Sequence, residues 1–369
     1  MNETILTWIV FILAFGGMVL IHEFGHFIAA RLCGVEVEEF GIGLPTPGAL
    51  TLFTWKGTRF TLNWLPLGGF VRPKGENDPS VEGGLAAASP WKRLIVLFAG
   101  PMMNLVAAIL IFGFIVTRAG VPIPDHVLIT DVIQNSPAAA AGIQKGDILL
   151  KGNGQSIRGY DDLRKVIDPN ESNPVVFSVD RNGQQLDLTV TPQKSAEDQR
   201  VVIGVYFEEQ YTYQPVTSPF QAIQFGATAT YNSARTLISL PAQLVRGSLP
   251  AEQSRLIGLK GIYDIMQQSV ARDVEASQST TPTSNPFEKM RTLGLIASLS
   301  ISLGIFNLFP FPALDGGRII FLLPELIFRR RVSPQVENLI HGMGMAFLLL
   351  LMIYINVMDF INPINVTIP

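Results

Sequence analysis

Residues 5–30 read ILTWIVFILAFGGMVLIHEFGHFIAA, and this stretch decides the class of fold to which the chain belongs. Its first part, Ile5–Ile21, carries no charge. Together with the residues that follow, it reaches the roughly 20 apolar residues that a helix needs to cross a bilayer. A secretory signal peptide would need a basic segment before this run, and the only early charge is Glu3. We therefore expect a membrane-spanning helix here.

The composition of the whole chain agrees with a membrane protein. Charged residues make up 15% of the 369 residues, well below the roughly 25% of soluble domains, and the mean hydropathy is +0.32. The formal net charge of −3, without a basic helix, excludes a nucleic-acid partner. Cys33 is the single cysteine, which excludes disulfides within the chain and cysteine-based zinc sites.

Four apolar stretches predict membrane-spanning helices. We place these helices at residues 1–34, 91–118, 291–317 and 336–369, the last with a C-terminal tail. The third stretch is interrupted by Pro310 and Pro312, so we expect its inner end to be irregular. Residues 35–90 and 318–335 are expected to be loops, the first of them rich in β-structure and associated with the membrane.

Basic residues predict the orientation, because cytoplasmic loops carry an excess of lysine and arginine. Neither 1–4 nor 359–369 contains one. The loop between the first two spans holds seven, namely Arg31, Lys56, Arg59, Arg72, Lys74, Lys92 and Arg93, and the loop after the third holds Arg318, Arg329, Arg330 and Arg331. Both termini are therefore expected outside the cytoplasm, as is the long region between spans two and three.

Residues 119–210 predict a small extracytoplasmic α+β domain. Two hairpin turns are expected at Asn153-Gly154 and Asn182-Gly183, and a helix over 160–167. The run Ser136–Ile157 resembles a PDZ domain in the circularly permuted form of bacterial proteases, which implies binding of an extended peptide by strand addition. Val202–Val205 fits either a carboxylate-binding loop or an ordinary strand with a glycine. Residues 211–290 predict interfacial helices followed by a flexible linker over 271–286.

The segment His22-Glu23-Phe24-Gly25-His26 matches the pattern H-E-x-x-H. On a helix the two histidines share one face and can reach one metal ion, with Glu23 beside them to accept a proton from water. Ionisable side chains inside a membrane segment are costly and usually functional. A buried polar cluster or a proton path is the alternative interpretation of the same residues.

A catalytic zinc ion needs a third protein ligand, and three candidates exist. His126 lies in the extracytoplasmic domain, and His341 lies near the cytoplasmic end of the fourth span. Asp315, in Leu314-Asp315-Gly316-Gly317, is favoured because the prolines before it break the helix and the glycines after it allow a tight turn. His26 and Asp315 each precede a basic residue, Arg31 and Arg318, so both should lie at the same depth near the cytoplasm.

These motifs, with Gly100-Pro101-Met102-Met103-Asn104 on the second span and Asn307–Gly317 on the third, resemble the site-2 protease family of intramembrane zinc metalloproteases. With one PDZ-like domain, the chain is similar to bacterial inner-membrane members that cleave single-span anti-sigma factors. The resemblance implies Zn²⁺ held by His22, His26 and Asp315, and Glu23 as catalytic acid/base. It also implies Asn307 as a substrate contact.

The resemblance further implies transmembrane protein substrates, the lipid bilayer and a peptide at the PDZ-like domain as partners. It also implies that residues 40–74 offer a strand edge to an extended substrate. One departure concerns Ile257–Gly261, where family members commonly carry a Gly-Pro pair. An inactive membrane adaptor and a transporter remain the competing hypotheses, although the internal repeats of transporters are not visible.

Overall fold

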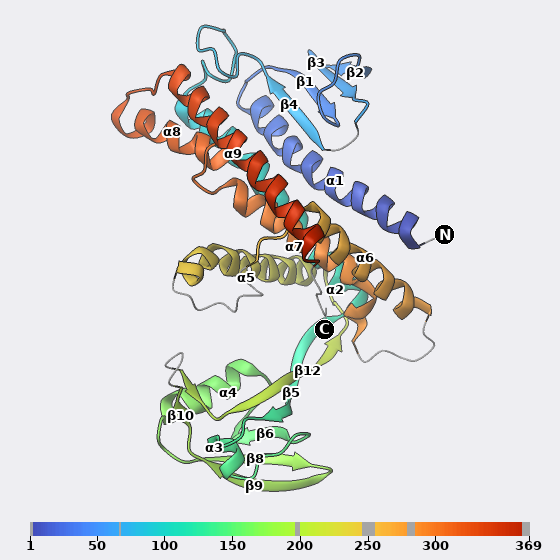
Figure 1. Ribbon diagram of the computed structural model, residues 1–369, viewed down its shortest axis with the longest axis vertical. Coiled ribbons are helices and arrows are strands. Elements are labelled where there is room, and N and C mark those ends of the chain that lie inside the picture. The colour runs from blue at the N-terminus through green and yellow to red at the C-terminus, as the bar shows by residue number, and fades with distance from the viewer. Residues whose placement is uncertain (1–2, 66–67, 196–199, 246–254, 279–284, 364–369) are drawn as a thin grey trace. The chain divides into compact units, whose positions relative to one another are not determined.

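The computed structural model describes residues 3–65, 68–195, 200–245, 255–278 and 285–363. The chain forms two compact units. The first consists of Met1–Arg118 with Thr217–Pro369, and the second is Ala119–Val216, the PDZ-like domain. Figure 1 shows the helices of the first unit and the strands of the second.

Among the described residues, four helical stretches are long and apolar enough to cross a membrane. They are α1 (Glu3–Leu32), α2 (Pro90–Ala119), α9 (Pro334–Ile361) and the 22-residue stretch formed by the 3₁₀ helix η2 (Pro286–Met290) and α7 (Arg291–Asn307). On α9, Leu339, Leu350 and Phe360 expose 64%, 68% and 68% of their surface. Apolar side chains this exposed are expected of a helix that faces lipid.

The third span ends earlier than the sequence predicted. Helix α7 stops at Asn307, and the turn that follows contains Pro310 and Pro312, whose rings cannot continue a helix. A new helix, α8 (Asp315–Phe328), then begins. The prediction of a loop over 318–335 is therefore wrong for residues 318–328, because an apolar run after Gly317 continues the helix that Asp315 starts.

The predicted flexible linker over 271–286 is also wrong in its first part. Helix α6 (Leu259–Gln278) extends through residues 271–278, while 279–284 lie outside the described residues. Its Asp273 accepts hydrogen bonds from the backbone N–H groups of Arg291 and Thr292, at 2.9 and 3.0 Å, and so caps α7. One of the helices predicted within residues 211–290 is α5 (Pro219–Val245).

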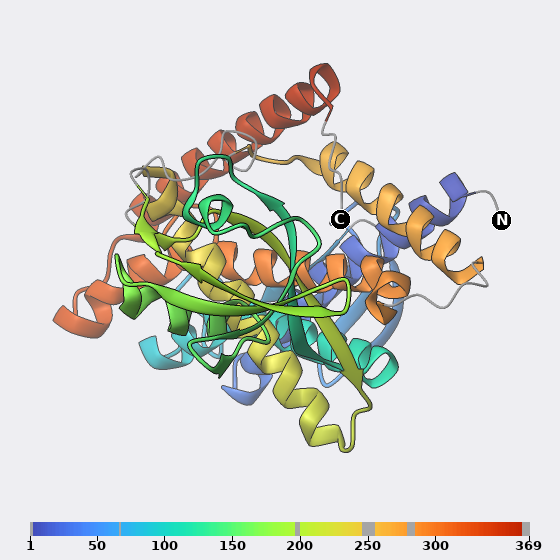
Figure 2. The same cartoon turned by 90° about the horizontal axis from the view of Figure 1, so that it is seen from below.

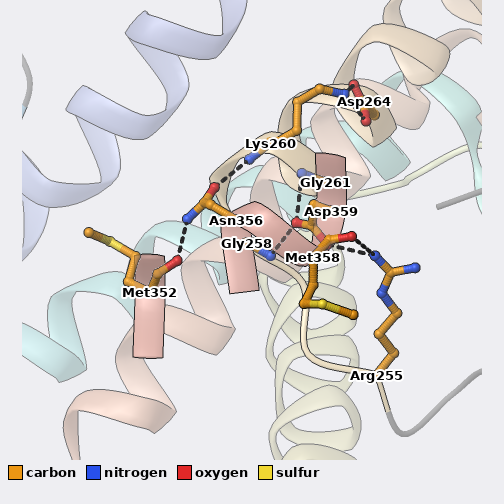
Figure 3. Close-up of polar contacts among 9 residues, drawn as sticks. All are labelled: Arg255, Gly258, Lys260, Gly261, Asp264, Met352, Asn356, Met358 and Asp359. Atoms are coloured by element: carbon orange, nitrogen blue, oxygen red, sulfur yellow. Dashed lines mark hydrogen bonds and ion pairs between the residues drawn. The ribbon is translucent and has the colours of Figure 1, made fainter. Parts of the chain in front are cut away.

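Helix α6 is anchored at both sides. Its Tyr263 ring packs on Trp8 of α1, with 4.5 Å between ring centroids, and Figures 1 and 2 show α6 beside the first half of α1. At its N-terminus, the backbone N–H groups of Gly258 and Gly261 donate to Asp359 of α9 at 2.8 and 3.1 Å (Figure 3). An aspartate in this position satisfies N–H groups that have no partner within the helix.

The β-rich loop forms one four-stranded sheet beside α1 (Figure 1). Its strands are β1 (Val37–Ile42), β2 (Leu50–Trp55), β3 (Thr58–Leu62) and β4 (Gly69–Pro73), in the order β2-β3-β1-β4. The β2–β3 hairpin turns at Lys56-Gly57, both with positive φ. Phe27 of α1 packs on Phe40 and Phe60 of the sheet, which fixes the sheet against the first helix.

The PDZ-like domain contains one curved sheet, drawn in green in Figures 1 and 2. Its strands run in the order β12-β5-β6-β8-β9, with β7 beside β6. Their bounds are β5 (Val121–Val132), β6 (Ile148–Gly152), β7 (Gln155–Ser156), β8 (Val175–Arg181), β9 (Gln184–Val190) and β12 (Val205–Gln214). A short pair, β10 (Gln193–Lys194) and β11 (Val201–Val202), and the helices α3 (Pro137–Ala140), α4 (Tyr160–Ile167) and η1 (Asp168–Asn170) complete the domain.

Both hairpin turns predicted in this domain are confirmed, since Asn153, Gly154, Asn182 and Gly183 all have positive φ. The predicted helix over 160–167 is α4. The domain has a core of its own, in which Val127, Leu149 and Phe177 are fully buried.

Candidate metal centre

The three residues predicted as metal ligands lie together. His22 and His26 share one face of α1, and Asp315 is the first residue of α8. The Asp315 Oδ2 atom is 3.1 Å from His22 Nε2 and 3.4 Å from His26 Nε2, and the two Nε2 atoms are 3.1 Å apart. Among the described residues this is the one group of His, Cys, Asp and Glu side chains with metal-site spacing.

The distances between these atoms fit zinc. In a tetrahedral site with bonds of about 2.0–2.1 Å, two ligand atoms lie about 3.3 Å apart. The three observed distances lie close to this value. Two imidazoles and one carboxylate also leave a fourth position for water, as in catalytic rather than structural zinc sites.

The histidine nitrogens that face away from Asp315 have partners on α2. His26 Nδ1 lies 2.8 Å from the backbone oxygen of Val96, which can only accept, so Nδ1 carries the proton and Nε2 offers its lone pair. A carbonyl bound in this way is the usual outer partner of a metal-ligating histidine. This contact could not be predicted from the sequence, because a backbone oxygen makes it.

The second histidine contacts Asn104, which is fully buried on α2. His22 Nδ1 lies 3.5 Å from Asn104 Nδ2, while Asn104 Oδ1 is buried without a partner among the described residues. Turning this amide by 180° places Oδ1 toward His22 Nδ1–H and leaves His22 Nε2 free to bind a metal. A polar residue inside an apolar span is the sequence signal for this role.

Gly100 allows α1 and α2 to approach at this point. A Cβ atom at position 100 would lie 2.3 Å from His26 Nε2, and one at Gly25 would lie 2.3 Å from the Ala99 oxygen. Small residues permit such close helix packing in membranes. The glycine of the Gly100-Pro101 pair is therefore required by the space that the His26 ring occupies.

Glu23 is half-buried and lies between the helix and the sheet. Its Oε2 atom accepts a hydrogen bond from the backbone N–H of Val71 on β4, at 3.0 Å. Because β4 is an end strand, one of its edges has no neighbour in the sheet, and the bond to Glu23 shows that this N–H points away from β1. The carboxylate beside the proposed metal ligands therefore binds the edge of β4 that has no neighbouring strand.

The remaining candidates do not belong to this group of three side chains. His126 is on β5 of the PDZ-like domain, next to Asp125. His341 is on α9, and its Nδ1 atom accepts the N–H of Ala313 at 2.9 Å. Asn307 is the last residue of α7, and its Nδ2 donates to the Leu303 oxygen at 2.9 Å within the same helix.

Comparison with known proteins finds metalloproteases, in agreement with the metal-site spacing of these side chains. The model of a family described as "Peptidase family M50" matches residues 10–351. A protein of Clostridium perfringens named as a candidate zinc metalloprotease is 33% identical over 358 residues, which are 96% of this chain and 98% of that protein. The metalloprotease MmpA of Caulobacter vibrioides is 28% identical over 378 residues, 91% of each chain.

Among solved structures, the PDZ domain of an SdrC-like protein of Listeria monocytogenes matches 22% of this chain and 87% of its own. The identity is 15% and the TM-score 0.21.

Proposed function

Because this chain belongs to peptidase family M50 and is a multi-pass zinc metalloprotease, we propose that it cleaves single-span membrane proteins inside or at the edge of the bilayer. The observation that carries the proposal is the set of His22, His26 and Asp315 beside Glu23, on helices whose surfaces suit lipid. Regulated proteolysis, for example of anti-sigma factors or remnant signal peptides, is the corresponding role.

The edge of β4 that has no neighbouring strand supports a substrate bound as an extended strand. A peptide added there pairs with backbone groups of β4 and brings its own carbonyl next to Glu23, whose carboxylate already reaches Val71 N–H. A transmembrane substrate must unwind to do this, because the carbonyls of a helix are hydrogen-bonded within it. Asn307, at the end of α7, is the side chain we assign to hold the unwound backbone.

In the proposed reaction, His22, His26 and Asp315 hold a zinc ion, which when bound lowers the pKa of water and polarises the scissile carbonyl. Glu23 takes the proton from the attacking water at its carboxylate and delivers it to the nitrogen of the leaving amine. Val96 and Asn104 orient the histidine rings. The amide of Val71 holds the Glu23 carboxylate in place.

The distribution of basic residues supports a location in the bacterial inner membrane, with both termini extracytoplasmic and the metal near the cytoplasmic side. The PDZ-like domain is then extracytoplasmic. Its strand β12 is also an end strand, and Arg164 of α4 donates to the Val201 oxygen at 2.8 Å beside Ile203-Gly204. We assign this edge to binding an extended segment or a chain end of a substrate.

The deciding experiment is cleavage of a single-span model substrate by the Glu23→Gln variant in proteoliposomes. Turnover should fall about 100-fold or more, since the amide cannot take a proton, while bound zinc stays unchanged. Glu38→Gln, an exposed carboxylate on β1, is the matched control and should cleave normally. Near-normal turnover by Glu23→Gln would exclude the proposed hydrolysis and favour the adaptor or transporter hypothesis.

A further inference from the structure

The turn between α7 and α8 has an unfavourable backbone conformation immediately before the aspartate. Ala313 has φ of 78°, in the left-handed region that residues with a side chain rarely adopt. Asp315 follows two residues later and begins α8. A conformation of this kind persists only where surrounding contacts impose it. Some part of the protein must therefore hold the turn in place.

Helix α9 makes those contacts with residues spaced three apart along one side. His341 Nδ1 accepts the N–H of Ala313 at 2.9 Å. Gly344 lies against Pro312, where a Cβ atom would approach the Pro312 Cβ to 2.4 Å. The ring of Phe347 packs on Phe311, with 5.8 Å between centroids. Three positions of α9 thus contact three successive residues of the turn.

The hydrogen bond from Ala313 determines the state of the His341 ring. A backbone N–H can only donate, so Nδ1 must be unprotonated and the ring neutral, with its proton on Nε2. Nε2 is buried and has no partner among the described residues. One face of the ring packs on Phe321 of α8, 5.5 Å between centroids. Among the described residues, the His341 ring therefore contacts the turn through Ala313 and α8 through Phe321, and it joins no wider polar network.

We propose that His341 is a positioning residue for the metal centre, which acts through Ala313 to fix the direction of Asp315. This role rests on the proposed function of Asp315 as a ligand. Without an acceptor at position 341, the Ala313 N–H loses its partner in a half-buried site, and the peptide group is free to rotate out of its left-handed conformation. The Asp315 carboxylate then loses its alignment with His22 and His26.

Asparagine and glutamine at position 341 separate this role from simple packing. The Asn carbonyl oxygen falls near the position of Nδ1, whereas the longer Gln side chain places its oxygen near Nε2. Both are uncharged amides, so their effects on membrane insertion are matched. His341→Ala removes the acceptor altogether. Met343→Asn, at a position 66% exposed on the same turn of α9, controls for the introduction of an amide into this helix.

The full-length protein is purified for each variant, and three properties are measured. They are zinc affinity by competition with a chelator, the visible absorption of the Co²⁺-loaded protein, and kcat and KM for a single-span substrate. His341→Ala and His341→Gln should each weaken zinc binding about tenfold or more, the usual effect of losing an outer partner. They should also shift the Co²⁺ spectrum and lower kcat at unchanged KM. His341→Asn and Met343→Asn should resemble the parent.

Equal behaviour of His341→Asn and His341→Gln would overturn the proposal, whether both bind zinc normally or both lose it. A loss in Met343→Asn as large as in His341→Gln would do the same. If His341→Ala does not accumulate, the comparison of Asn with Gln still decides the matter. If Asp315 is not a zinc ligand, the result is different: the Asp315→Asn variant then binds zinc normally, independently of the residue at position 341.

Discussion

Replacing Asp359 by alanine should detach the start of α6 from the end of α9. Asp359 is 1% exposed and accepts hydrogen bonds from Gly258 N–H at 2.8 Å, Gly261 N–H at 3.1 Å and the Arg255 guanidinium at 2.9 Å (Figure 3). The Ala variant leaves two buried backbone N–H groups without an acceptor, one immediately before α6 and one in its first turn. Each costs about 1–3 kcal/mol, so the free energy of unfolding should fall by about 4 kcal/mol. Arg255 is partly exposed and regains water.

Two other variants calibrate this value. Asp359→Asn keeps one carbonyl oxygen for the amides and loses only the charge, so its loss should be about half as large. Asp264→Ala is the matched control, because Asp264 lies on α6, the helix that Asp359 holds, and pairs with Lys260 in a more exposed i,i+4 ion pair. Such pairs contribute about 0.3–0.5 kcal/mol.

The assay is equilibrium unfolding in mixed micelles with increasing SDS. Trp8 packs on Tyr263 of α6 and reports its docking on α1 once Trp55, Trp64 and Trp91 are replaced by Phe. Far-UV circular dichroism follows the helices in parallel. If Asp359→Ala loses no more stability than Asp264→Ala, the cluster contributes nothing to the attachment of α6, and the reasoning is refuted.

Three further predictions follow from other parts of the molecule. Asn307→Ala should keep its zinc and raise KM about 3- to 10-fold, because one substrate hydrogen bond is lost, and a fall in zinc content would instead place Asn307 among the ligands. Burial, the largest influence on the Asp147 pKa, raises it, but hydrogen bonds from Arg181 and the Gln144 N–H outweigh burial and hold this pKa below its usual value. The Asp147 carboxylate should therefore stabilise the PDZ-like domain above the unfolded-state pKa of about 3.9 and lose that contribution as pH falls further, and urea titrations of residues 119–216 should show no such acid dependence for Asp147→Asn. Replacing residues 119–216 by a short linker should leave zinc bound and a short single-span peptide still cleaved. Substrates with large extracytoplasmic parts should also become cleavable. If a folded variant no longer cleaves the short peptide, the PDZ-like domain does not act by selecting substrates.

Local sequence patterns were sufficient to predict much of the fold. The spans followed from uninterrupted apolar runs, and both turns of the PDZ-like domain followed from Asn-Gly pairs. The three ligands were also predictable, because H-E-x-x-H fixes two of them on one helix face and the basic residues indicate the depth of Asp315. The structure brings these three together, although their role as ligands stays a prediction until zinc is measured.

The failures share a physical cause, which is that tertiary contacts override local composition. Residues 271–278 are polar and were predicted as linker, but Asp273 caps α7 and Val270 is buried, so the helix continues. The parallel pairing of β1 with β3 spans an intervening strand and has no local signal. The Val71 N–H that holds Glu23 is a backbone group, which any residue except proline would supply.

The outer partners of the two histidines come from a single face of α2. Val96, Gly100 and Asn104 are spaced four residues apart and therefore lie along one side of that helix. Val96 contacts His26 and Asn104 contacts His22, so the order along α2 is the reverse of the order along α1, as consecutive antiparallel spans require. Two histidines on α1 could bind a metal with either ring nitrogen, but the Val96 oxygen on this face of α2 assigns the proton of the His26 ring to Nδ1. The orientation of the two histidines in the proposed metal centre therefore depends on α2, which contributes none of the three proposed ligands, as well as on the H-E-x-x-H helix.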